Sequence, residues 1–166
     1  GRWAGAEVDR VGLLEDACVA GADYIDLEFK AFKDIKLRQA QLVVSWHDFE
    51  KTPEDLDRLL GRMGALEPGV VKLAVKANSA SDAMRVVAAQ KRASRPSALV
   101  AIGEFGEPLR VLYRRYGGFL GYASLRAREE AAPGQLTVEA LVKGYRAKTV
   151  DDETKDFHGD LQQRVA

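Results

Sequence analysis

Cysteine is almost absent from this chain of 166 residues, since Cys18 is the only one. A single cysteine forms no internal disulfide. Cys18 shares a helical apolar pattern with Leu14, which suits a small buried side chain in a reducing compartment. The first residues also lack the basic and apolar pattern of a secretory signal. These absences predict a cytoplasmic protein.

Long apolar runs and an excess of one charge are also missing. The longest apolar runs, such as 42–45 and 70–75, are far shorter than the roughly 18 residues of a membrane span. The 25 basic residues balance 25 acidic ones, so no electrostatic footprint for nucleic acid or an anionic membrane is present. We therefore expect one globular domain that binds neither nucleic acid nor membrane.

The glycine-rich turn of dinucleotide-binding folds is absent as well. The stretch most like a G-x-G-x-x-G turn, at 103–106, lacks the third glycine and follows the fourth predicted strand instead of the first. This absence disfavours a doubly wound dinucleotide-binding sheet.

What the sequence does contain is a regular alternation of helical and strand patterns. Strands are predicted over 24–29, 41–45, 70–75, 98–102 and 119–122. Helices are predicted over 8–20, from a Thr52 cap to Gly64, from Ser81 past Ala88, over 108–116 and from a Thr137 cap to Tyr145. Single helices between strands are typical of βα units. The prediction is an α/β protein with about five parallel βα units, part of a TIM (β/α)₈ barrel, because a closed barrel needs eight strands.

His47 lies in the motif Ser-Trp-His-Asp-Phe, which directly follows the second predicted strand. Barrel enzymes place their active sites at the carboxyl ends of strands. An imidazole titrates near neutral pH, so His47 at this position suits a general acid and base. The alternative is a histidine that caps the next helix region or points to solvent.

Lys72 interrupts the apolar run 70–75 where a buried parallel strand should be continuously hydrophobic. An apolar barrel interior favours a neutral amine, which is the nucleophile that forms a Schiff base with a ketone. The alternative is a lysine near the strand start whose stem reaches solvent.

Two later positions suit substrate binding. Arg110 lies in the first turn of the helix after the fourth predicted strand, where a guanidinium can hold a carboxylate in a bidentate way. Gln135 follows a Pro-Gly turn after the fifth predicted strand, where it could lie over the same opening as part of a lid.

In order and spacing these motifs resemble the type I 3-dehydroquinate dehydratase family. The segments that carry the resemblance are Tyr-Ile-Asp-Leu-Glu at 24–28, Ser-Trp-His-Asp-Phe at 45–49, Lys-Leu-Ala-Val at 72–75, Gly106 with Arg110, and Ala-Pro-Gly-Gln at 132–135. The resemblance covers roughly residues 1 to 146. It implies a (β/α)₈ lyase of the shikimate pathway that dehydrates 3-dehydroquinate to 3-dehydroshikimate through a lysine Schiff base, without a metal or organic cofactor.

The resemblance also implies roles for individual residues. Lys72 would form the imine, His47 would move the proton and help expel water, and Arg110 would hold the substrate carboxylate. Gln135 corresponds to a lid glutamine that contacts substrate. For His47, an orienting carboxylate is expected on the neighbouring strand, either Asp26 or Glu28.

The chain departs from the family pattern in two places. Ala131 stands where the family usually has a lid serine, and the resemblance begins after the family's third barrel strand. The chain therefore corresponds to the carboxyl-terminal five-eighths of a barrel. We expect open sheet edges near Tyr24 and Phe119, incomplete packing of interior side chains such as Val43, Leu73 and Ala101, and a homodimer when the barrel is complete.

The predicted division is a partial barrel over 1–148 and a linker or disordered tail over 149–166. Residues 145–155 resemble the linker that leads into a shikimate dehydrogenase domain in bifunctional members. Two other functions stay open: another Schiff-base barrel such as a class I aldolase, and a catalytically silent truncated fragment that associates through its sheet edges.

Overall fold

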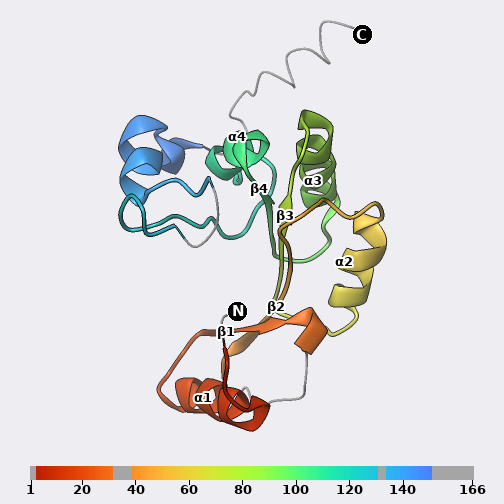
Figure 1. The fold of residues 1–166 in the computed structure, drawn as a ribbon, viewed down its shortest axis with the longest axis vertical. Helices are drawn as coiled ribbons and strands as arrows, with labels where there is room; N and C mark the ends of the chain where they lie inside the picture. The colour runs from red at the N-terminus through yellow and green to blue at the C-terminus, as the bar shows by residue number, and fades with distance from the viewer. Residues whose placement is uncertain (1–2, 32–38, 131–133, 151–166) are drawn as a thin grey trace, which may run out of the picture.

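The fold is an open parallel sheet with helices, seen in a computed structural model that describes residues 3–31, 39–130 and 134–150 (Figure 1). The four strands are β1 (Tyr24–Glu28), β2 (Gln41–Asp48), β3 (Val70–Lys76) and β4 (Ser97–Ile102), hydrogen-bonded in that order. The α-helices are α1 (Glu7–Val19), α2 (Leu56–Gly64), α3 (Ala80–Arg92) and α4 (Glu107–Val111). Short 3₁₀ turns cover Phe29–Ala31, Glu104–Gly106 and Ala147–Thr149, and a π-helix covers Ala140–Gly144. The predicted α/β class with parallel βα units is confirmed.

The two faces of the sheet differ because successive side chains of a strand point to opposite sides. On one face, Leu73, Val75 and Ala101 are fully buried beneath α2 and α3, which lie on the same side of the strands in Figure 1. The expectation that Leu73 and Ala101 face the barrel interior is therefore wrong. The strand register places them on the outer, helix-covered face, where their packing is complete.

Helix α2 begins later than the sequence predicted. Asp55 is its N-cap and accepts a hydrogen bond from the Arg58 N–H at 2.8 Å. The hydroxyl of Thr52 instead donates to the carbonyl of Lys76 at 2.8 Å and ties the end of β3 to the loop. The predicted N-cap, Thr52, is therefore three residues too early, because its hydroxyl bonds to the Lys76 carbonyl instead of capping the helix.

The predicted fifth strand over 119–122 is not part of the sheet. Its backbone makes one bond to β4, from the Phe119 N–H to the Ser97 carbonyl at 2.7 Å. Further along β4, the Leu99 N–H donates to the buried side chain of Gln90 at 2.9 Å. Because a side chain already occupies this edge, the ladder does not continue, and the prediction of five strands is corrected to four.

The later helices are shorter, or wound with a wider turn, than predicted. Helix α4 ends at Val111 rather than Tyr116, and turns continue the chain from there. Thr137 caps the last helical segment as predicted, since its Oγ1 accepts from the Ala140 N–H at 3.0 Å. That segment winds mainly as a π-helix.

Strand β1 forms an edge of the sheet, as predicted, because it pairs only with β2 in the described part of the chain. Helix α1 packs on β1 through Cys18, which contacts Ile25 and Leu27, and leaves Val8 and Val19 exposed. Of the predicted tail, 151–166 lies outside the described residues. No helix within the described ranges combines the length and apolarity needed to cross a membrane.

Candidate functional site

A cavity of about 470 Å³ lies on the face of the sheet opposite α2 and α3. Five of the six residues singled out from the sequence line it: Glu28, His47, Lys72, Arg110 and Gln135. They come from β1, β2, β3, α4 and the segment that begins at Gly134, so the fold gathers positions more than 100 residues apart (residue 28 to residue 135). The predicted clustering at the carboxyl side of the sheet is present in the structure.

His47 is held by Glu28 from the neighbouring strand. The carboxylate Oε2 lies 2.6 Å from His47 Nδ1, and Oε1 accepts the His47 backbone N–H at 3.2 Å. Phe49 stacks on the imidazole with 6.0 Å between ring centroids. These contacts fix the ring plane and leave Nε2 without a hydrogen-bond partner among the described residues.

The same pair sets the charge of Glu28. Burial raises the pKa of this carboxyl group, but the hydrogen bonds and charge of His47 outweigh burial and leave the pKa below its ordinary value of 4.5. Glu28 is therefore an ionised acceptor at neutral pH, and it favours the Nδ1–H form of the imidazole, with Nε2 available as a base.

Lys72 lies between a carboxylate and an aromatic ring. Its Nζ is 2.8 Å from Asp26 Oδ2 and 4.9 Å from the ring centroid of Tyr122. The pKa of Tyr122 is raised, first by burial and also by the charge of Asp26, while Lys72 opposes the shift. Tyr122 therefore stays a neutral phenol, and its ring forms a wall of the cavity beside the amine.

Arg110 lines the cavity and is buried although it carries a charge, with 8% of its surface exposed. Its Nε donates to the Ala101 carbonyl at 3.4 Å. Burial lowers the pKa of Arg110, and the charge of Glu107 opposes that shift, but a guanidinium stays protonated at neutral pH. A Cβ built on Gly106 would lie 1.9 Å from the Ala101 carbonyl, so only glycine lets α4 approach the end of β4 this closely.

Of the two predicted lid positions, Gln135 and Ala131, the structure describes only Gln135. Gln135 lines the cavity, as expected for the lid position. Ala131, where a lid serine was expected, lies outside the described residues. Gly134 precedes Gln135 with φ of +73°, and a Cβ built on it would lie 3.3 Å from the Gly103 carbonyl oxygen, so this segment passes close to the end of β4.

Sequence reasoning left two contacts undetermined. Either Asp26 or Glu28 could be the partner of His47, because both are acidic positions in the same alternating apolar and acidic strand pattern. The structure pairs Glu28 with His47 and Asp26 with Lys72. Tyr122 was missed, since within a predicted strand no local signal indicated that its ring would face Lys72.

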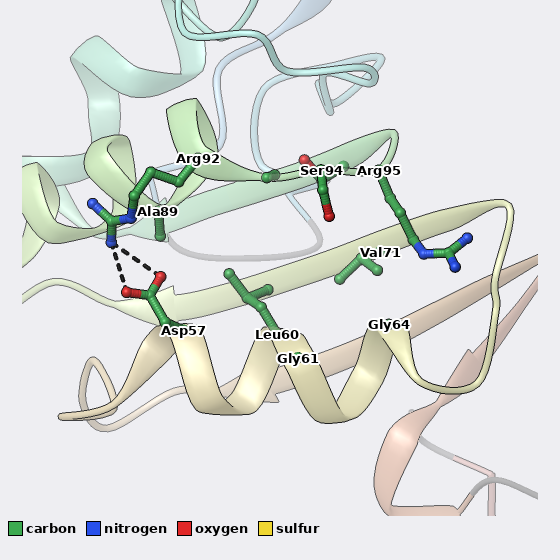
Figure 2. Close-up of a pocket in the computed structure, with 11 residues that line it drawn as sticks. Asp57, Leu60, Gly61, Gly64, Val71, Ala89, Arg92, Ser94 and Arg95 are labelled. Carbon is green, nitrogen blue, oxygen red and sulfur yellow. Dashed lines mark hydrogen bonds and ion pairs between the residues drawn. The ribbon is translucent and has the colours of Figure 1, made fainter.

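A second cavity, of about 310 Å³, lies on the opposite face, between α2 and α3 (Figure 2). Asp57 and Arg92 form an ion pair at 2.9 Å across it, and both side chains are more than half exposed. None of the residues predicted for chemistry lines it. Within the described ranges, no group of three or more His, Cys, Asp or Glu side chains is placed to hold a metal ion.

Comparison with known proteins identifies related sequences. The sequence model of the family described as type I 3-dehydroquinase matches residues 1–152. The bifunctional 3-dehydroquinate dehydratase/shikimate dehydrogenase of Arabidopsis thaliana is 31% identical over 166 residues, which cover 95% of this chain and 28% of that protein. The 3-dehydroquinate dehydratase of Methanosarcina mazei is 35% identical over 158 residues, covering 86% of this chain and 65% of the relative.

Solved structures agree with the fold. The type I 3-dehydroquinate dehydratase of Clostridium difficile superposes with a TM-score of 0.77 at 21% identity, over 90% of this chain and 65% of that one. The 3-dehydroquinate dehydratase of Aquifex aeolicus gives a TM-score of 0.70 at 29% identity, over 87% of this chain and 67% of that one. The chain thus spans about two thirds of the length of these single-function relatives.

Proposed function

This chain belongs to the type I 3-dehydroquinase family, and from that membership we propose that it carries the Schiff-base part of a 3-dehydroquinate dehydratase site. The reaction would convert 3-dehydroquinate to 3-dehydroshikimate with loss of water. One observation carries the proposal: a shielded lysine and a histidine paired to a carboxylate line one cavity. An imine-forming amine and a proton-transfer base are the two groups that such a dehydration needs.

In the proposed mechanism Lys72 attacks the substrate ketone and forms an iminium ion. A cationic C=N accepts electrons better than a ketone, so the neighbouring C–H becomes acidic enough for a side-chain base to remove its proton. The amine side chain is only 17% exposed, which keeps bulk water from competing at the imine.

His47 is the proposed base, because Glu28 occupies Nδ1 and leaves Nε2 toward the cavity. After removing the proton from carbon, the imidazolium would protonate the leaving hydroxyl, which departs as water. Glu28 stabilises that imidazolium and fixes the ring. Proton removal and return by one side chain restores the site for the next turnover.

Arg110 and Gln135 are the proposed substrate-binding residues. The guanidinium of Arg110, which lines the cavity, would pair with the carboxylate of the substrate. Gln135, which lines the same cavity, would donate hydrogen bonds to substrate hydroxyls or accept them. A homodimer, a cytoplasmic location and the tail over 149–166 stay predictions.

Reductive trapping tests this function. The chain is incubated with 3-dehydroquinate or 3-dehydroshikimate, reduced with borohydride and digested, and the modified lysine is found by mass spectrometry. We expect the adduct on Lys72 and none in Lys72→Arg. An adduct on Lys76, which lies on the same strand, would contradict the assignment. An increase in the absorbance of the enone product distinguishes dehydration from the carbon–carbon bond cleavage that an aldolase would catalyse.

A further inference from the structure

Strand β1 carries two carboxylates on the same face, of which Glu28 lines the cavity, and each pairs with a different nitrogen base. Asp26 and Glu28 are two residues apart, so both side chains lie on the same face of the strand. Glu28 contacts His47 on β2, whereas Asp26 contacts Lys72 on β3. The two proposed chemical groups therefore have separate acidic partners.

The path of the Lys72 side chain brings it to Asp26 rather than to Glu28. In the strand register Glu28, Ser45 and Lys72 are level with one another. Lys72 nevertheless leans across β2 to reach Asp26, over the buried side chains of Val43 and Ser45. Both oxygens of Glu28 already contact His47, and the amine contacts Asp26 instead.

From this arrangement we propose that Asp26 is a catalytic proton acceptor and donor for Lys72 during imine formation, and that Tyr122 positions the amine. The inference rests on the proposed Schiff-base function. The ring of Tyr122 faces Nζ and favours a cation there, both the ammonium and the iminium. Its neutral phenol is not a base, which leaves the proton to Asp26.

The proton balance is complete with Asp26 alone. Asp26 takes one proton from the Lys72 ammonium, and the neutral amine adds to the carbonyl carbon. A second proton moves from nitrogen to the carbonyl oxygen and gives the carbinolamine. Asp26 then returns its proton to the departing hydroxyl, the C–O bond breaks, and the nitrogen lone pair forms C=N. Water leaves, the third proton stays on the iminium nitrogen, and Asp26 is again a carboxylate.

The exposed fractions of the Asp26 and Lys72 side chains agree with a carboxylate that exchanges protons and an amine that is shielded. The Asp26 side chain is 42% exposed, against 17% for Lys72. One side of the carboxylate therefore meets solvent and can exchange its proton, while the other contacts the shielded amine.

The test compares two reactions of the Lys72 amine that need no recognition of 3-dehydroquinate. Acetic anhydride acylates a neutral amine directly, whereas formaldehyde with cyanoborohydride methylates it only after a carbinolamine has lost water. Both rates are measured residue by residue by mass spectrometry in the chain and in Asp26→Asn. Lys143, which pairs with Glu139 at 2.9 Å on the surface, is the internal reference, and Glu139→Gln is the matched control.

We expect the ratio of methylation to acylation at Lys72 to fall about tenfold or more in Asp26→Asn, because the dehydration step loses its acid. Asp26→Glu should recover most of the ratio. At Lys143 the ratio should not change in Glu139→Gln. An unchanged ratio at Lys72 would overturn the inference, because a carboxylate that only holds the ammonium alters both reactions equally.

The outcome is separable from that of the proposed function. A fall in the ratio without any trapped 3-dehydroquinate adduct would support Asp26 and contradict the dehydratase proposal. A trapped adduct with an unchanged ratio would support the dehydratase proposal and contradict the role of Asp26. Should Asp26→Asn leave the chain unfolded, Asp26→Ser removes the same carboxylate and is measured in the same way.

Discussion

At the scale of single residues, the site depends on which carboxylate reaches which base. The Glu28 carboxylate makes two hydrogen bonds to one residue, His47, and so holds both its ring and its backbone. Asp26 makes a single contact to Lys72 and stays partly exposed. The first arrangement suits a fixed orienting group, and the second suits a group that exchanges a proton.

The lowered pKa of Glu28 predicts a dependence of stability on pH. A carboxyl group whose pKa is lower in the folded state stabilises the fold above its unfolded pKa, and this stabilisation is lost as the pH falls through the folded pKa. We therefore expect Glu28→Gln to reduce the free energy of unfolding by about 1 to 3 kcal/mol at pH 7. The difference from the parent chain should shrink below about pH 4.5.

Urea unfolding at pH 7 and pH 4 measures this difference. Glu139→Gln removes an exposed carboxylate that also pairs with a base, and it is the control. It should change stability by less than about 0.5 kcal/mol at either pH. If Glu28→Gln changed the free energy of unfolding as much at pH 4 as at pH 7, the stabilisation would not come from the lowered pKa of Glu28.

At the scale of elements, Gln90 joins three parts of the fold. This side chain of α3 is buried; its Nε2 donates to Ser97 Oγ at 2.7 Å and to the Gly117 carbonyl at 3.2 Å, and its Oε1 accepts the Leu99 N–H. It therefore satisfies polar groups of β4 and of the following loop together. A buried amide used in this way fixes the helix against the strand edge.

Gln90→Met should destabilise the chain by about 2 to 4 kcal/mol, because it leaves buried polar groups without partners while keeping a similar volume. Thermal and urea unfolding measure the change. Arg92→Met on the same helix is the matched control, since Arg92 is exposed and forms only a surface ion pair. Equal effects of the two substitutions would mean that Gln90 does not carry the connection.

At the scale of the whole molecule, the open sheet is the main feature. Strand β1 has no neighbour on its outer side within the described residues, and α1 leaves apolar side chains such as Val8 uncovered. Unpaired strand edges bind other strands, and exposed apolar surface favours association. A chain with this architecture should self-associate.

Tyr24→Lys tests this prediction by placing a charge at the beginning of the unpaired strand. We expect sedimentation velocity over a concentration series to show association of the parent chain and a marked decrease in the variant. Leu125→Lys is the control, because Leu125 is 83% exposed but lies outside the strands. An equal decrease in both variants would attribute association to general hydrophobicity instead of to the β1 edge.

The sequence by itself determined most of the elements and predicted which residues carry the chemistry. Periodicity and caps predicted the four strands and, with different ends for α2 and α4, the four α-helices of the described residues, because these signals are local. Lys72 stood out because a charge in a buried strand needs a reason, and His47 because of its place at the end of a strand. The family followed from the order and spacing of such motifs.

Only the tertiary structure decided how those residues pair. Asp26 and Glu28 have the same local pattern, and the tilt of side chains across β2 assigned one to Lys72 and the other to His47. The fifth strand was excluded by Gln90 and by the turn after α4, neither of which is visible from residues 119–122 alone. Local patterns set what a segment can form, whereas contacts between segments distant in sequence set which partner it finds.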